Sequence, residues 1–154
     1  MPIQNKKSSV HIIYGSTSGN TQMVSETVAM LLEQQKKSVS LTRAEMATEK
    51  DLKKADLTIL ASSTYGHGLL QEYMQAFVDK NEAVDLKKHA FAVIGLGDPK
   101  YDAQYHIEAA PILEEWIQKH NGIVVTPALR ISGAPVRHLK TLVPLWVKQL
   151  LTAM

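Results

Sequence analysis

Residues 10–21 read VHIIYGSTSGNT, an apolar run that leads into a loop of glycines and hydroxyls. The run at 10–14 has the length and composition of a buried strand. After Asn20 the apolar residues switch to helical spacing, and one stripe contains Val24, Val28, Leu31 and Leu32. The segment therefore predicts a strand, a tight loop and a helix in direct succession.

The same alternation continues along the chain. Further strands are predicted at residues 39–42, 57–61, 90–94 and 123–125, and helices around 73–78, from about 104 to 120 and from about 136 onward. Pro111 and Pro144 fall inside helical patterns, which predicts a kink or a late helix start at each. Strands that alternate with helices indicate parallel pairing with helices on both faces. We expect an α/β fold, doubly wound, with a five-stranded parallel sheet in a single domain spanning residues 1–154.

Composition and charge exclude several classes of function. The 154 residues are 45% hydrophobic, enough for one core, and none is cysteine, which excludes disulfides, thiol chemistry and an iron–sulfur cluster. The 17 basic and 15 acidic residues are scattered, so nucleic-acid binding is not expected. No apolar run reaches the roughly 20 residues of a membrane span, and no secretory signal follows the polar start, so we expect a cytoplasmic protein without membrane contact. The six histidines show no metal-ligand spacing, and no catalytic residues are predicted.

The first loop has the chemistry of a phosphate site. Residues 15–21, GSTSGNT, bring hydroxyls and backbone N–H groups to the start of a helix, where the helix dipole is positive. The loop lacks the lysine of a Walker motif, which favours a terminal monophosphate held by neutral donors. The alternative is that these residues form only a turn and a helix cap.

Two further loops are predicted at the same edge of the sheet. Residues 63–68, STYGHG, and 97–101, GDPKY, each place a tyrosine in a turn after a buried strand. Tyr65 and Tyr101 could equally be surface aromatics packed on their own loops. Turn chemistry alone does not predict two aromatic loops beside a phosphate loop, and the combination fits flavin mononucleotide (FMN) better than a nucleoside triphosphate, which would require Mg²⁺ ligands.

These three segments resemble the flavin loops of flavodoxins: YGSTSGNT at 14–21, STYG at 63–66, and GLGD at 95–98 followed by Tyr101. The resemblance covers nearly the whole chain and is to the short-chain type, with loops similar to the FMN domains of diflavin reductases. It implies a flavodoxin-like sheet with strand order 2-1-3-4-5 and FMN as cofactor. The FMN-binding residues would be Ser16, Thr17, Ser18, Gly19, Asn20, Thr21, Ser63, Thr64, Tyr65, Gly66, Gly97, Asp98, Tyr101 and Tyr105.

The resemblance also implies a function and partners. The chain would be a monomeric electron carrier rather than an enzyme, shuttling electrons between a flavodoxin reductase and acceptor enzymes. The loops depart from the family's acidic rim, since His67 follows the second loop's tyrosine and Lys100 lies beside Asp98. We therefore expect docking that differs from that of acidic flavodoxins.

Three alternatives remain open at this point. A response-regulator receiver shares the topology but would need acidic residues where Tyr14-Gly15 and Ser62-Ser63 stand. An FMN-dependent quinone reductase is the enzymatic alternative. A third is a flavodoxin-like protein that binds flavin weakly and serves as an interaction or assembly module.

Overall fold

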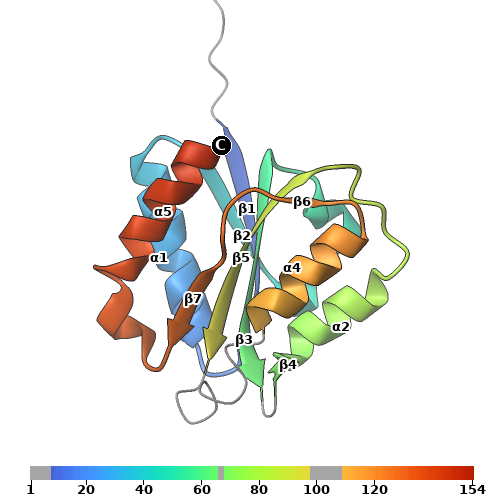
Figure 1. Cartoon of the computed structure of the whole chain (residues 1–154), viewed down its shortest axis with the longest axis horizontal. Helices are drawn as coiled ribbons and strands as arrows, with labels where there is room; N and C mark the ends of the chain where they lie inside the picture. Colours follow the sequence, from blue (N-terminus) through green and yellow to red (C-terminus); the bar gives the residue numbers. More distant parts are fainter. Residues whose placement is uncertain (1–7, 66–67, 98–108) are drawn as a thin grey trace, which may run out of the picture.

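The computed structural model describes residues 8–65, 68–97 and 109–154. Over these ranges a central sheet lies between two layers of helices (Figure 1). The strands are β1 (Ser9–Gly15), β2 (Ser38–Arg43), β3 (Leu57–Tyr65), β4 (Leu69–Leu70), β5 (Ala90–Gly97), β6 (Ile123–Val124) and β7 (Leu129–Ser132). The helices are α1 (Asn20–Gln34), α2 (Glu72–Lys80), α4 (Ala109–Lys119) and α5 (Leu142–Ala153), with short 3-10 turns η1 (Ala44–Met46), η2 (Glu49–Leu52) and η3 (Pro135–His138).

The sheet has the predicted topology. Its strands run in the order β2-β1-β3-β5-β6, all parallel, and β7 continues beside β5. If the short β4 is left out and β6 and β7 are counted as one interrupted strand, β5 becomes the fourth strand and the order is 2-1-3-4-5. The doubly wound flavodoxin-like fold is therefore confirmed. The short β4, which pairs antiparallel with the end of β3, was not predicted.

The last strand, predicted at residues 123–125, is interrupted and resumes as β7. Five positions separate Val124 from Leu129, whereas the facing interval from Phe91 to Ile94 spans only three, so the chain bulges between β6 and β7. Pro127 lies in the bulge and has no N–H to give to a ladder. Its carbonyl instead accepts a hydrogen bond from Nε1 of Trp146 on α5, at 2.8 Å.

Two apolar cores cover the two faces of the sheet. On one face α1 and α5 bury Val28, Leu32 and Trp146 against β1, β3 and β5. On the other, α2 and α4 bury Phe77 and Leu113. The packed helices thus hold the described strand ends at the sheet's carboxyl edge in place.

The two prolines predicted to disturb helices lie in α5 and α4. Pro144 is the third residue of α5, and the predicted helix from about 136 is divided into η3 and α5, so the late start is confirmed. Pro111 is the third residue of the described part of α4. In the first turn of a helix a proline removes no intrahelical hydrogen bond, which explains why α5 tolerates Pro144.

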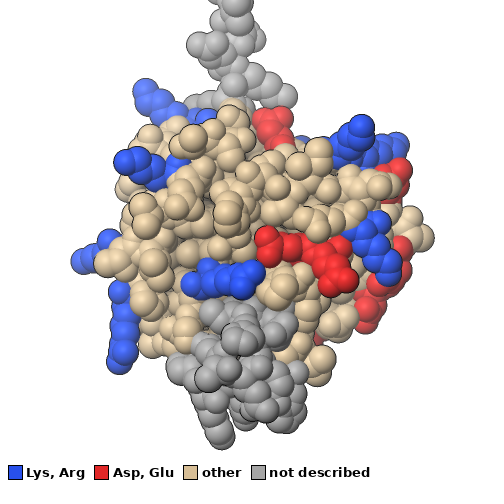
Figure 2. Space-filling model, in the orientation of Figure 1, with Lys and Arg blue, Asp and Glu red and all other residues tan. Residues whose placement is uncertain are grey.

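Charge is distributed unevenly. On the face shown in Figure 2, Lys and Arg border the side over α5, whereas both signs occur over α2 and α4. The sequence agrees for the side over α5, because residues 133–154 contain no acidic residue and carry Arg137, Lys140 and Lys148. Among the described helices, none is long and apolar enough to span a bilayer.

Candidate functional site

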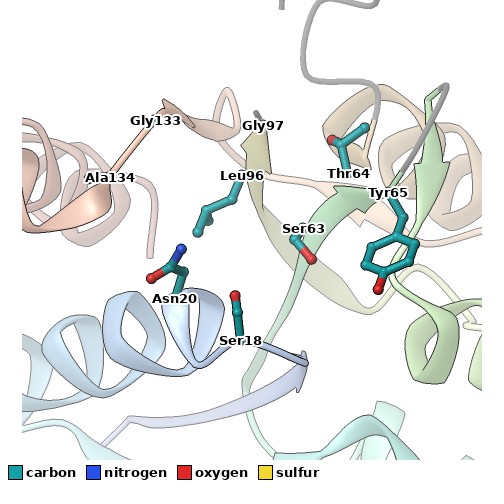
Figure 3. A pocket seen from close by; sticks show the side chains of 9 residues that line it. All are labelled: Ser18, Asn20, Ser63, Thr64, Tyr65, Leu96, Gly97, Gly133 and Ala134. Atoms are coloured by element: carbon teal, nitrogen blue, oxygen red, sulfur yellow. The ribbon is translucent and has the colours of Figure 1, made fainter. Parts of the chain in front are cut away.

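A pocket opens at the carboxyl edge of the sheet, where the loops after β1, β3 and β5 meet (Figure 3). Its volume is about 310 Å³. The described residues that line it are uncharged: Ser18, Asn20, Ser63, Thr64, Tyr65, Leu96, Gly97, Gly133 and Ala134. Six of these are among the predicted FMN-binding residues, so the structure brings all three predicted loops to one place.

The loop between β1 and α1 leaves the helix start open. Gly19 takes a left-handed conformation with φ of 93°, which glycine adopts without a Cβ penalty, and it occupies the N-cap position. Its N–H donates to Ser16 Oγ at 3.1 Å, and its carbonyl accepts the first helical bond from Met23 N at 2.9 Å. Because the cap is a glycine, no N-cap side chain is present to satisfy the first N–H groups of α1.

This geometry bears on the two interpretations of the loop. Glycine can cap a helix, but unlike Ser, Thr or Asn it offers no side-chain acceptor to the first N–H groups. Here Ser18 and Asn20 line the pocket instead. The positive end of the helix dipole, the first amides of α1 and these polar side chains are groups that suit an anion.

One buried hydroxyl supports the fit to a phosphate. Thr21 is only 1% exposed, and within the described ranges its Oγ1 has no hydrogen-bond partner. It belongs to the first turn of α1, beside the open amides. A buried hydroxyl without a partner costs desolvation free energy, which a phosphate oxygen would offset.

The second loop is held by the end of β3. Pairing of Thr64 with Leu70 and of Tyr65 with Leu69 folds β4 back onto this strand. Thr64 Oγ1 also accepts a hydrogen bond from Ala109 N at 3.1 Å, which connects the loop to the start of α4. Tyr65 remains 52% exposed at the side of the pocket, so its ring face is available to a planar ligand (Figure 3).

Close backbone packing defines the third side of the pocket. A Cβ added at Gly95 would lie 2.8 Å from Ala110 Cβ, so only glycine lets β5 approach α4 this closely. Two residues further on, Gly97 lines the pocket, and its carbonyl accepts from Gly133 N at 3.2 Å.

Gly133 and Ala134 were not predicted as site residues. They follow β7, whose carboxyl end lies beside that of β5. Gly133 has φ of 78°. The strand predicted at 123–125 ends well before Gly133, so without β7 no local pattern placed this glycine after a strand at the carboxyl edge.

The remaining predicted residues divide into two groups. Ser16, Thr17, Gly19 and Thr21 belong to the first loop and helix turn beside the pocket. Gly66, Asp98, Tyr101 and Tyr105 lie outside the described residues, as do His67 and Lys100. The predicted absence of a metal site is compatible with the described part of the chain, where no cluster of three potential ligands occurs.

Comparison with known proteins gives the family. Residues 12–146 match the family profile described as Flavodoxin. The chain belongs to the flavodoxin family. A flavodoxin from Maridesulfovibrio salexigens is 33% identical over 129 residues, which are 82% of this chain and 87% of that protein. The protein MioC homolog of Pasteurella multocida is 29% identical over 151 residues, 95% and 98% of the two chains.

A solved structure agrees with this assignment. Oxidised Flavodoxin 2 from Bacillus cereus superposes with a TM-score of 0.87 at 28% identity, covering 96% of this chain and 100% of that one. As a flavodoxin, the protein binds FMN and transfers electrons, and the predictions of family and cofactor are confirmed. The uncharged, hydroxyl-rich pocket suits that cofactor, because FMN carries one terminal phosphate and one large planar ring.

Proposed function

We propose that this flavodoxin is a monomeric electron carrier, with residues 1–154 forming a single domain, that takes electrons from a reductase and delivers them to acceptor enzymes. The observation that supports this best is the pocket itself, whose described lining offers binding groups and, apart from the Tyr65 phenol, no ionisable side chain. Such a lining can hold and tune a redox cofactor but supplies few groups for acid–base catalysis.

The described residues would divide the binding between them. Ser18, Asn20 and the amides at the start of α1 would hold the phosphate, with Thr17 and Thr21 supplying further hydroxyls. Tyr65 would stack on the ring, and Ser63, Thr64 and Gly97 would contact the same group from the ends of β3 and β5. Bound FMN supplies the redox chemistry. The half-exposed Tyr65 leaves this side of the pocket open, as exchange with a partner protein requires.

The uneven charge bears on docking. The segment from 133 to 154 begins with the pocket residues Gly133 and Ala134 and continues through α5, and its charged side chains are all basic. An acidic partner surface would be steered toward this side, so electron transfer to such a partner should slow as ionic strength rises. A rate that does not change with salt would show that this side takes no part in the encounter.

The test of the carrier function is a reduction assay. Purified protein should carry FMN and show its visible absorbance. NADPH alone should reduce it slowly, whereas NADPH with a catalytic amount of a flavodoxin reductase should reduce it fully, and cytochrome c should reoxidise it. Rapid reduction by NADPH alone, coupled to a quinone, would instead identify a quinone reductase.

A pair of variants links that activity to the pocket. Replacing both Ser18 and Asn20 by alanine should release FMN during gel filtration and abolish the reductase-dependent reduction. Thr152→Ala is the matched control, because this exposed threonine lies near the end of α5, at the opposite edge of the sheet (Figure 1). If the double variant retained FMN as firmly as the control, the proposed site would be wrong.

A further inference from the structure

We propose that Gln71 is a positioning residue that orients the Thr17 hydroxyl so that its proton points to the phosphate of FMN. This inference depends on the proposed function, since it assumes that Thr17 is one of the phosphate ligands. Gln71 was not among the predicted site residues, and it lies outside the pocket lining.

Hydrogen bonds fix which way round the Gln71 amide lies. Gln71 is the N-cap of α2, and its Oε1 accepts from Tyr73 N at 2.9 Å and from Met74 N at 3.1 Å. A backbone N–H can only donate, so the amide oxygen must face the helix. The Nε2 group therefore faces away from α2, where it donates to Thr17 Oγ1 at 2.9 Å.

That contact determines the direction of the Thr17 hydroxyl. A threonine hydroxyl has one proton to donate and two lone pairs with which to accept. Since Gln71 Nε2 has no lone pair to offer, the bond between them occupies a lone pair of Thr17 and leaves its proton free. Thr17 is exposed in the loop beside Ser18, so this proton is available to an anion in the pocket.

Gln71 is rigidly held, as a positioning residue must be. It is fully buried, and its own N–H donates to Ser62 Oγ and to Ser63 O, both at 3.1 Å. A Cβ added at Gly15 would lie 2.3 Å from Gln71 Oε1, so the end of β1 leaves room for this amide only because it is glycine. Gln71 is thus tied to the first loop through its side chain and to the end of β3 through its backbone N–H, and it packs closely against the end of β1.

The substitution Gln71→Glu separates the two roles of the amide. A carboxylate still accepts from Tyr73 N and Met74 N, and its negative charge suits the N-terminus of α2, so the helix cap is preserved. It cannot donate to Thr17, which would instead donate its proton inward to the carboxylate. We expect FMN affinity to fall about tenfold, as loss of one hydrogen bond to a charged group predicts, and riboflavin affinity to change less than about twofold.

A double-mutant cycle removes the effect of the added charge. If Gln71 acts through Thr17, Gln71→Glu should change FMN affinity less than about twofold in a Thr17→Val background. If it acts by repelling the phosphate, the loss should be the same in both backgrounds, which would overturn the inference. Thr17→Ser, which keeps the hydroxyl, should retain FMN affinity within about threefold.

The wild-type protein provides a measurement that does not depend on a variant folding. The Gln71 side-chain amide resonances should shift when FMN binds and stay unmoved with riboflavin, which lacks the phosphate. Shifts of equal size with both ligands would contradict a role at the phosphate. Failure of the proposed phosphate site can be told apart from failure of the Gln71 inference. If the site is wrong, wild-type protein will bind FMN and riboflavin equally. If only the Gln71 inference is wrong, Gln71→Glu will prefer FMN over riboflavin as strongly as wild type does.

Discussion

The two edges of the central sheet carry similar polar residues but use them differently. At the amino edge, Ser9 N donates to Asp56 Oδ2 at 2.9 Å, and Asp56 N donates back to Ser9 Oγ at 3.0 Å. At the carboxyl edge, Thr21 Oγ1 is buried without a partner among the described residues, and Thr17 keeps a proton that Gln71 does not take. Polar groups at the first edge stabilise the fold, and those at the second are arranged for a ligand.

The amino half of the sheet also contains a buried histidine, whose Nε2, like Thr21 Oγ1, has no hydrogen-bond partner among the described residues. His11 Nδ1 lies 2.6 Å from Ser40 Oγ, and its Nε2 lies 3.9 Å from Asp51, which itself pairs with Lys54 at 3.1 Å. The residue types alone would suggest a reactive site. Their partners show why they are structural, since the short contacts close within the chain rather than toward a pocket.

The largest effect that separates the edges should come from Asp56→Ala. Removing this carboxylate leaves both Ser9 donors without their acceptor, so the free energy of unfolding should fall by about 1–3 kcal/mol in urea titrations. FMN affinity should stay within about twofold of wild type. Asp79→Ala is the control, since this exposed carboxylate on α2 accepts only from Gln75 in the described structure, and it should cost less than about 0.5 kcal/mol. A large loss of FMN affinity in Asp56→Ala would show that the two edges are coupled.

Thr21→Val should do the reverse of Asp56→Ala, weakening FMN binding without lowering the stability of the apoprotein. Valine keeps the shape of threonine and removes a buried hydroxyl that has no partner, so the apoprotein should be as stable as wild type or more stable. FMN affinity should fall about tenfold, measured by quenching of flavin fluorescence. Thr27→Val on the same helix is the control, because the Thr27 hydroxyl donates to Met23 O, and it should leave FMN affinity unchanged. A destabilised apoprotein with normal FMN affinity would make Thr21 a structural residue.

Tyr65→Ala should weaken binding through the ring rather than the phosphate. Loss of one stacked aromatic should lower the affinities for FMN and riboflavin alike, by about 1 kcal/mol or roughly fivefold. The exposed position of Tyr65 predicts little change in stability. Tyr73→Ala, at a comparably exposed tyrosine on α2, should leave both affinities intact. Tyr65 would have no place in the site if only FMN, and not riboflavin, were affected.

The smallest effect concerns the pH dependence of the amino edge. Burial, assisted by Lys54 and opposed by Asp51, lowers the pKa of His11, and burial likewise lowers that of His89. The unfolded chain therefore takes up protons more readily than the folded one below a pH of about 6.5, so stability present above that pH should be lost as the pH falls. Urea midpoints measured across this range should decline less steeply in His11→Leu than in wild type. An identical slope in the two proteins would mean that His11 contributes nothing to it.

Most of the fold could be predicted from the sequence because the patterns that indicate its strands, loops and helices are local. The change from an apolar run to helical spacing around residues 10–34 locates β1, the loop and α1, and the loop's glycine and hydroxyls identify the anion site. Three features could not be predicted from the sequence because they depend on tertiary contacts. The bulge at Pro127 is fixed by Trp146, β4 by pairing with β3, and the role of Gln71 by a threonine 54 positions away. Glutamine is also an uncommon N-cap, so no local pattern singled it out.

Phosphate recognition without a cationic side chain is the claim on which this account depends most. Titrating the apoprotein with FMN and with riboflavin, under the same buffer and salt, tests it directly. Several charge-assisted hydrogen bonds at the start of α1 predict that FMN binds at least about a hundredfold more tightly than riboflavin. Equal affinities for the two flavins would contradict the account, since the hydroxyls and amides of the first loop would then contribute nothing to binding.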